Sequence, residues 1–184
     1  MNETFQFTVK RFKELESTNT FTRQMAEEGA EEGLVIVADF QTGGRGKPGS
    51  RWVSPAGKNL LLSVLLRPRV APNKAPMITQ IVCRSVAKVL GQHGIISTFK
   101  RPNDVMVHGK KICGVLVESC TESDQLESVI VGIGLNVNAE NREMVPEAIS
   151  MKEVKGHDLE TEKILEELLL CLKSDLGDFY SHSS

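Results

Sequence analysis

Short apolar runs that follow one another along the chain limit the folds it can adopt. Most of these runs are rich in leucine, valine or isoleucine, and each has the length of a β-strand. The runs are LVIVADF (34–40), NLLLSVLLR (59–67), ISTFK (96–100), DVMV (104–107), KICGVLVES (111–119) and SVIVGIGLNV (128–137). Turn-forming or charged pieces separate the last four, which is typical of antiparallel hairpins. The sequence therefore predicts an α+β fold with a mixed, largely antiparallel sheet flanked by helices, not a βαβ array.

Three helices are expected around this sheet. Ser17 and Thr18 offer N-cap hydroxyls to a short first helix. Apolar residues recur at helical spacing over 77–90 and again over 164–176, which predicts two longer helices with one face toward the core. No internal repeat separates these elements, so we expect a single domain over 1–184.

The composition excludes several classes of protein. The formal net charge is −2, with 22 basic and 24 acidic residues, so no overall attraction to DNA or RNA is expected. No apolar segment resembles a signal peptide or a membrane span, which predicts a cytoplasmic protein without membrane contacts. The four cysteines form no C-x-x-C pair and the four histidines show no ligand spacing. We therefore expect reduced thiols and no protein-bound zinc.

The stretch QTGGRGKPGSRW (41–52) lies between two predicted strands and is rich in glycine and cations. Its GRGKPG segment matches G-x-G-x-x-G, but a strand follows where a dinucleotide site needs a helix, and the P-loop pattern fails as well. From these residues alone, two interpretations stay open. The loop amides could form an anion-binding nest, with Arg45 as a bidentate fork and Lys47 as a point charge, or the loop could be a solvated hairpin tip.

The motif KRPND (100–104) places two cations, an amide and a carboxylate around a proline. In a functional interpretation, Lys100 meets a polyphosphate and Asp104 meets its magnesium ion, because Mg²⁺ usually takes one or two carboxylates plus phosphate oxygens. The alternative is turn chemistry, in which the side chains of the Asn-Asp pair bond to nearby backbone amides.

Glycines interrupt two of the apolar strands, although glycine weakens a strand interior. Gly114, Gly132 and Gly134 therefore indicate either the close approach of a ligand or crowding between packed strands. Asn136 follows at the end of the second of these strands and offers a hydrogen-bonding amide.

Taken in order, five segments resemble the successive signatures of the biotin protein ligases, the biotin–acetyl-CoA-carboxylase ligases. The segments are ESTNT, ADFQTGGRGKPGSRW, SPAGKNLLLSVLLRP, KRPNDVMVHGKKICGVLVES and VIVGIGLNVN, which lie within 12–140. The resemblance implies a catalytic domain similar to the class II aminoacyl-tRNA synthetases. It also implies the activity: biotin and ATP form biotinyl-5'-AMP with release of pyrophosphate, and the biotinyl group then passes to a lysine of a biotin carboxyl carrier protein of acetyl-CoA carboxylase.

The resemblance also implies roles for individual residues. Arg45 and Lys111 are the implied catalytic residues: Arg45 would hold the biotin carboxylate and the α-phosphate together, and Lys111 would neutralise charge developing on that phosphate. The implied biotin-binding residues are Ser17, Thr18, Asn19, Gln41, Gly44, Arg45, Lys111, Gly114, Gly132 and Gly134. The implied ATP- or adenylate-binding residues are Arg45, Gly46, Lys47, Trp52, Lys100, Asn103, Asp104, Lys111 and Asn136, with Asn136 facing the adenine or ribose and Asp104 meeting Mg²⁺ on the ATP phosphates.

The residue types fit this chemistry without the resemblance. Attack of a carboxylate on ATP brings two anions together, so cations such as Arg45, Lys100 and Lys111 are needed to suppress their repulsion. The mixed anhydride that forms is already activated, and the sequence has no convincing Ser-His-Asp or Cys-His set, in keeping with an enzyme that needs no nucleophile of its own. A glycine loop that folds over the adenylate would keep it from water.

The sequence departs from the family pattern at several points. Arg101 stands where the family usually has tryptophan, and Lys47 and Pro48 stand where arginines are frequent. The last predicted helix ends the chain, so neither a C-terminal SH3-like domain nor an N-terminal helix-turn-helix with repressor function is expected. The alternatives are a lipoate ligase or lipoyl transferase, and a non-catalytic biotin-binding module. A homodimer through the exposed sheet fits the family but is not determined by the sequence.

Overall fold

The computed structural model describes residues 6–47, 49–68, 70–122 and 125–183, and these residues form a seven-stranded sheet with helices on both faces. The strands are β1 (Thr8–Leu15), β2 (Leu34–Gln41), β3 (Leu60–Leu66), β4 (Thr98–Lys100), β5 (Asp104–Val107), β6 (Lys110–Glu122) and β7 (Gln125–Leu135). The α-helices are α1 (Thr18–Glu27), α2 (Ala75–Gln92), α3 (Met151–Lys155) and α4 (Thr161–Ser183), and two short 3-10 turns are η1 (Pro72–Lys74) and η2 (Asn141–Glu143).

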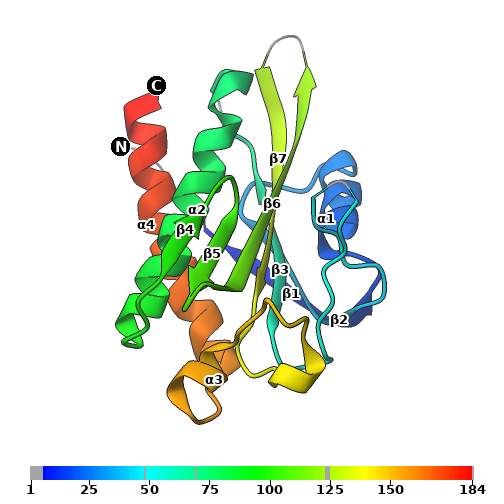
Figure 1. The fold of residues 1–184 in the computed structure, drawn as a ribbon. Coiled ribbons are helices and arrows are strands. Elements are labelled where there is room, and N and C mark those ends of the chain that lie inside the picture. The colour runs from blue at the N-terminus through cyan, green and yellow to red at the C-terminus, as the bar shows by residue number, and fades with distance from the viewer. Residues whose placement is uncertain (1–5, 48, 69, 123–124, 184) are drawn as a thin grey trace.

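The strands lie in the order β1-β2-β3-β7-β6-β5-β4 (Figure 1). β1 pairs with β2 in parallel, and the other neighbouring strands pair antiparallel. The expected α+β class and the mixed, largely antiparallel sheet are therefore confirmed. β7 comes last in the chain among the strands but lies in the middle of the sheet, between β3 and β6.

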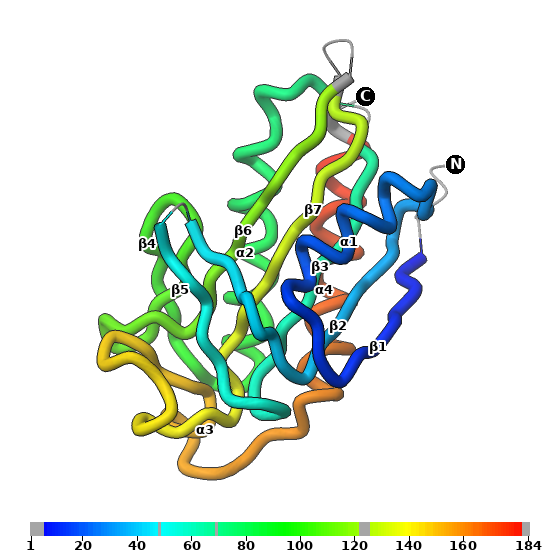
Figure 2. Tube along the Cα trace, turned by 90° about the vertical axis from the view of Figure 1, so that its right-hand side faces the viewer, coloured from blue at the N-terminus to red at the C-terminus, as the bar shows by residue number. Residues whose placement is uncertain are grey.

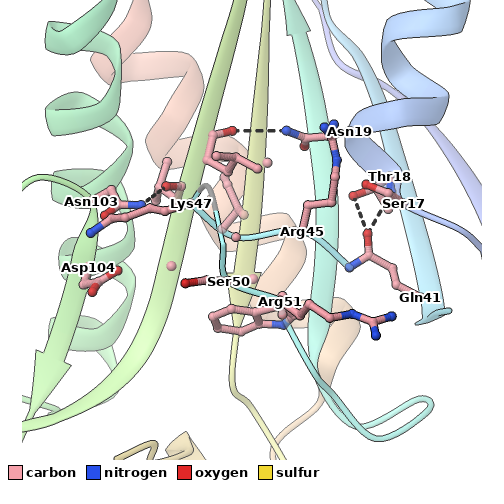
Figure 3. A pocket seen from close by; sticks show the side chains of 18 of the residues that line it. Ser17, Thr18, Asn19, Gln41, Arg45, Lys47, Ser50, Arg51, Asn103 and Asp104 are labelled. Atoms are coloured by element: carbon pink, nitrogen blue, oxygen red, sulfur yellow. Dashed lines mark hydrogen bonds between the residues drawn. The ribbon is translucent and has the colours of Figure 1, made fainter. Parts of the chain in front are cut away.

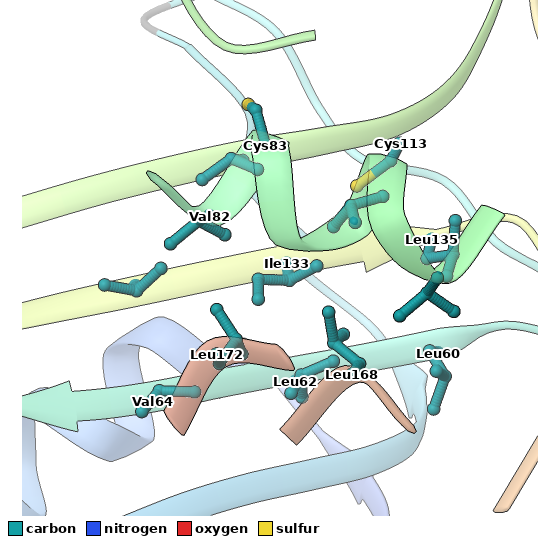
Figure 4. Close-up of a cluster of buried hydrophobic side chains, with 14 of the residues drawn as sticks. Leu60, Leu62, Val64, Val82, Cys83, Cys113, Ile133, Leu135, Leu168 and Leu172 are labelled. Atoms are coloured by element: carbon teal, nitrogen blue, oxygen red, sulfur yellow. The ribbon is translucent and has the colours of Figure 1, made fainter. Parts of the chain in front are cut away.

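The main hydrophobic core lies between the sheet and the two long helices, α2 and α4, which pack against each other on one face. Figure 4 shows side chains of β3 and β7 meeting those of α2 and α4, among them Leu62, Ile133, Val82 and Leu168. The opposite face carries α1 over a smaller apolar cluster and the loop that follows β2 (Figure 2). Burial of these large side chains on the α2/α4 face supplies most of the driving force for folding.

Strand periodicity decides which residues reach the α1 face. Side chains alternate between the two faces of a sheet, so the residues between the core positions of β3, β6 and β7 point toward α1. In the strand register, Ser63 of β3 and Leu116 of β6 both lie beside Gly132 of β7, and Gly114 lies beside Gly134. Gly114, Gly132 and Gly134 therefore leave part of the α1 face of the central strands free of side chains, which gives room for a site.

Two elements were not expected from the sequence. β1 alternates weakly between exposed and half-buried positions at the edge of the sheet, so its residues lack the apolar run of a buried strand. α3 is a helix of one turn whose N-cap Ser150 and Glu153 form a capping box. The three expected helices are confirmed as α1, α2 and α4, and the side chain of Ser17 caps α1 by accepting from Thr20 N.

Candidate active site

A cavity opens on the α1 face of the sheet, between the loop over 41–52, here called the glycine loop, and the central strands (Figure 3). Its volume is about 180 Å³, below the range of about 300–1,000 Å³ that is typical of small-molecule sites. Of the residues that the sequence indicates for a site, those that line this cavity are Ser17, Thr18, Asn19, Gln41, Arg45, Gly46, Lys47, Trp52, Asn103, Asp104, Lys111, Gly114, Gly132 and Gly134. The fold thus brings together segments that lie far apart in the sequence.

One end of the cavity is a cluster of hydroxyl and amide groups at the start of α1. Gln41 Oε1 accepts hydrogen bonds from Thr18 N at 2.8 Å and from Thr18 Oγ1 at 3.1 Å. Ser63 Oγ lies 2.7 Å from Thr18 Oγ1 and 2.6 Å from Asn19 Oδ1. Ser17, Thr18 and Asn19 are buried, so the fold holds these polar groups in place. A few fixed polar groups of this kind can orient the polar head of a mostly apolar ligand.

Gly132 permits the start of α1 to lie directly against β7. A Cβ atom at residue 132 would overlap Asn19 Oδ1, so any other residue here would push the Asn19 side chain away. The Asn19 amide also donates to Leu116 O at 3.3 Å and to Glu118 Oε2 at 2.8 Å. The close approach that the strand glycine indicates is therefore made by a side chain of the site itself.

Trp52, at the end of the glycine loop, covers the glycines at the other end of the cavity. A Cβ atom at residue 134 would lie 2.5 Å from Trp52 Cε2, and one at residue 114 would lie 3.0 Å from Trp52 Cζ3. The indole ring therefore packs directly against Gly114 and Gly134, here called the glycine floor. Its Nε1 atom is buried and has no hydrogen-bond partner among the described residues. A buried donor of this kind can bind an acceptor group of a ligand.

Lys111, Asp104 and Asn103 form a polar group beside the Trp52 ring. Lys111 Nζ lies 2.8 Å from Asp104 Oδ1 and 5.4 Å from the centre of the Trp52 ring. Asn103 Nδ2 donates to Val115 O at 2.6 Å. Within the described part of the chain, Asn103 Oδ1 and Asp104 Oδ1 are buried and accept no aligned hydrogen bond, so the contact of Asp104 with Lys111 is an ion pair without hydrogen-bond geometry.

Arg45 reaches from the glycine loop toward Asn19, away from Asn103 and Asp104 (Figure 3). Its Nη2 atom lies 2.7 Å from Glu118 Oε2, on β6. Glu118 Oε1 in turn lies 2.7 Å from Arg23 Nη2, on α1. The sequence alone does not indicate Glu118 or Arg23, because a lone carboxylate in a strand and a lone cation in a helix belong to no motif. Glu118 thus contacts Arg45 and Asn19, which line the cavity, and Arg23 in turn contacts Glu118.

The glycine loop has internal backbone order. Gly46 N donates to Ser50 O at 3.1 Å, Ser50 N donates to Lys47 O at 2.8 Å, and Trp52 N donates to Gly44 O at 3.0 Å. Lys47 and Gly46 line the cavity, whereas the expectation for Pro48 lies outside the described residues. The loop follows β2 and precedes β3, so it is not the start of a helix, as expected.

Comparison with known proteins identifies the family. The model of the biotin/lipoate A/B protein ligase family matches residues 11–136. The chain belongs to this family.

The bifunctional ligase/repressor BirA of Bacillus subtilis is 34% identical over an alignment of 173 residues, which covers 91% of this chain and 53% of the relative. The biotin–[acetyl-CoA-carboxylase] ligase of Mycobacterium tuberculosis is 33% identical over 141 residues, 73% of this chain and 51% of that protein. The structure of the biotin protein ligase from Aquifex aeolicus in complex with biotin and ATP superposes with a TM-score of 0.79 at 32% identity, covering 96% of this chain and 73% of that one. The chain spans about half the length of the curated relatives it matches.

Three residues that the family pattern indicates do not line the cavity. Lys100 lies in a neighbouring groove between α2 and the KRPND turn, which shares Asn103 and Asp104 with the cavity. Gly44 is buried beneath the loop, where a Cβ atom would overlap the backbone of Trp52. Asn136 is 3% exposed, and its amide donates to Ile149 O at 3.2 Å while its oxygen accepts from Asn59 at 3.2 Å. Direct ligand contacts by these three stay predictions.

Asn59 is a further residue to which the sequence assigned no role. Its Oδ1 atom accepts from Val137 N at 2.9 Å and Ala139 N at 3.2 Å, and its amide also donates to Ser54 Oγ at 3.0 Å. Because Asn59 and Asn136 together join the ends of β3 and β7, they brace the sheet beneath the Trp52 end of the cavity.

Two further findings concern membranes and metals. None of the described helices is long and apolar enough to cross a membrane. Within the described ranges, no three His, Cys, Asp or Glu side chains gather where they could hold a metal ion.

Proposed function

We propose that this protein is an ATP-dependent biotin ligase, which forms biotinyl-5'-AMP and transfers the biotinyl group to a lysine of a biotin carboxyl carrier protein. The observation that carries the proposal is that the polar cluster at Thr18 and Asn19 shares one cavity with two cations, Arg45 and Lys111. Relatives named as biotin–[acetyl-CoA-carboxylase] ligases and a related structure with biotin and ATP support it. We further propose that the described residues form the catalytic unit.

In the first step, an oxygen of the biotin carboxylate attacks the α-phosphorus of ATP. The new carboxyl oxygen–phosphorus bond forms as the bond from the α-phosphorus to pyrophosphate breaks, so the leaving group departs with its electron pair. Both reactants are anions, and fixed cations at the point of contact lower the barrier. We assign Arg45 and Lys111 to this task. Lys111 is already held by Asp104 and the Trp52 ring, so it need not reorganise during the reaction.

Asp104 and Asn103 fit a magnesium ion that enters with ATP. Mg²⁺ prefers oxygen ligands and is usually held by one or two carboxylates together with substrate phosphates. The Asp104 carboxylate and the buried Asn103 Oδ1, which accepts no hydrogen bond among the described residues, are oxygen ligands of this kind. Bound there, Mg²⁺ would offset the charge of the phosphates.

In the second step, the amine of the carrier lysine attacks the biotinyl carbonyl, and AMP leaves with the bonding electrons. The protein contributes no nucleophile, because the mixed anhydride is already activated. Its tasks are to hold the adenylate and to exclude water until the lysine arrives. We assign the second task to the glycine loop, whose Trp52 closes the cavity against the glycine floor.

The decisive experiment is biotin-dependent exchange of labelled pyrophosphate into ATP by the purified protein, with lipoate as the comparison acid. Exchange with biotin is expected. Exchange with lipoate alone would place the protein with the lipoate ligases of the same family, and exchange with neither acid would contradict ligase activity. Transfer to an isolated carrier domain, followed by mass spectrometry, then tests the second step. Action in the cytoplasm stays a prediction, which fractionation of cells can test.

A further inference from the structure

Glu118 joins three separate parts of the site. It lies on β6, and its carboxylate accepts from Arg23 of α1 at 2.7 Å, from Asn19 at the start of α1 at 2.8 Å, and from Arg45 of the glycine loop at 2.7 Å. Its side chain is 19% exposed, whereas those of both arginines are 38% exposed. The carboxylate is therefore the more buried partner in both ion pairs and the common point of all three contacts.

The charges of this group leave one cation in excess. Glu118 carries one negative charge and its two arginine partners carry two positive charges, so the cluster of Arg23, Glu118 and Arg45 keeps a net charge of +1 and still attracts an anion. A guanidinium has five N–H donors, and the contact of Arg45 with Glu118 uses the Nη2 end. Arg45 can therefore bind Glu118 and a ligand anion together.

Loss of Glu118 would affect the loop more than the sheet. Arg45 links the glycine loop to the sheet through its ion pair with Glu118. The backbone of β6 at residue 118 pairs with β7, and this pairing does not depend on the side chain of residue 118. Charge-assisted hydrogen bonds to a partly buried carboxylate are stronger than neutral ones. The side chain of Glu118 thus acts on the loop and on the start of α1, where the polar cluster of the cavity lies.

We propose that Glu118 is a positioning residue, which fixes Arg45 and Asn19 at one end of the cavity before a ligand binds. It holds the glycine loop against α1 in the free protein and keeps the Asn19 amide aligned for the biotin head. The second of these tasks rests on the proposed function, whereas the first concerns the free protein alone. Because Glu118 acts through Arg45 and Asn19, its removal should impair binding more than chemistry.

The test compares Glu118→Gln, which keeps the shape of the side chain but removes its charge, with Glu127→Gln as a matched control. Glu127 is exposed on the neighbouring strand β7, so its substitution should change nothing. Trp52 is the sole tryptophan of the chain and lies at the end of the glycine loop, so quenching of its fluorescence by acrylamide reports on the loop directly. Pyrophosphate exchange gives the KM for biotin and kcat.

For Glu118→Gln we expect more quenching of Trp52 in the free protein and a rise in the KM for biotin of about tenfold, the scale of one lost charge-assisted contact, with kcat within about twofold. Unchanged quenching and KM would overturn the proposal. A lowered KM would also overturn it, because Glu118 would then compete with the ligand for Arg45. If Glu118→Gln fails to fold, Glu118→Asp, which keeps the charge but shortens the reach, is measured by the same criteria. Wild-type protein without exchange would refute the ligase activity, whereas the quenching comparison would still decide whether Glu118 holds the loop.

Discussion

Lys111 Nζ lies 2.8 Å from Asp104 Oδ1, on the strand beside it, and 5.4 Å from the centre of the Trp52 ring. At the other end of the cavity, Arg45 is paired with Glu118 in the same way. Both cations that the proposed chemistry needs are therefore held by carboxylates before any ligand arrives. For Lys111 such preorganisation lowers the reorganisation that the reaction requires, whereas for Arg45 it favours ligand binding.

Replacing Lys111 by alanine should abolish adenylation without unfolding the protein. The substitution removes the cation assigned to the developing charge on the α-phosphate, and loss of one such group typically lowers the rate by about 100-fold or more. The measurement is biotin-dependent pyrophosphate exchange. The preceding residue, Lys110, is exposed on the same strand, so Lys110→Ala is a matched control that should retain activity. Equal rates for the two variants would remove Lys111 from the mechanism.

Replacing Gly134 by alanine should displace the Trp52 ring. The new Cβ atom would lie 2.5 Å from Trp52 Cε2, so the indole must leave its place on the glycine floor. We expect a changed fluorescence spectrum of Trp52 and a loss of adenylation of about 100-fold, since misplacement by about 1 Å is enough for such an effect. Gly91→Ala, in α2 with open space around the new Cβ, is the control and should stabilise the protein by up to about 1 kcal/mol. An unchanged spectrum in Gly134→Ala would contradict the packing of Trp52 described above.

Asp175 should make the protein more stable near neutral pH than in acid. The side chain is 2% exposed on α4, and it accepts hydrogen bonds from Lys88 Nζ at 2.5 Å and Ser85 Oγ at 2.7 Å. Burial acts to raise the pKa of Asp175, but the hydrogen bonds and the charges of Lys88 and Arg84 together outweigh it, so the pKa lies below its ordinary value. The unfolded chain therefore binds the proton more readily, and the stabilisation is complete above the ordinary value and is lost as the pH falls through the lowered pKa.

Asp175→Asn should accordingly lower the free energy of unfolding by about 2 kcal/mol at pH 7, and the difference from wild type should shrink below the ordinary pKa of an aspartate. Urea denaturation at a series of pH values measures both effects. Glu166→Gln, at an exposed position of the same helix, should leave the profile unchanged. A constant difference between Asp175→Asn and wild type at all pH values would show that the ion pair does not set the acid sensitivity.

Cys83 and Cys113 should resist alkylation in the folded protein. Both thiols are buried, and burial raises the pKa of Cys83 to about 11 and that of Cys113 well above its ordinary value. At pH 8 on the order of one Cys83 thiol in a thousand would be ionised, and the thiolate is the reactive form. With iodoacetamide and mass spectrometry we expect Cys120, which is partly exposed, to react first, and all four cysteines to react in denaturant. Early labelling of Cys83 would contradict this packing.

The sequence predicted the elements whose residues carry a strong local pattern. The apolar runs of β2, β3, β6 and β7 and the stripes of α2 and α4 were recognised because each buries a whole face. β1 was missed because an edge strand with one face toward solvent needs few apolar residues. α3 carries a short sequence signal, the spacing of Ser150 and Glu153 in a capping box, but its single turn has no apolar periodicity.

The site was predictable to the extent that its residues belong to motifs. Glycine, cation and amide residues in GRGKPG, KRPND and the start of α1 were brought into one cavity, as expected. Lys100 faces a neighbouring groove, and Asn136 is buried against other protein groups, because a motif fixes spacing along the chain but not the direction of each side chain. Glu118 and Asn59 could not be found from spacing, since their partners lie far away in the sequence.

The central position of β7 affects the order in which the sheet can form during protein synthesis. During synthesis β1, β2 and β3 emerge first, but β3 gains its second neighbour when residues 125–135 are available, and β6 pairs with that same strand. The pairing of β3 with β7 joins segments that lie far apart in the sequence, so it forms late, after the long loop between them has closed. The pairing of β6 with β7 is a local hairpin. A nascent chain that ends before β7 therefore lacks Gly132 and Gly134, which line the cavity and lie against Asn19 and Trp52.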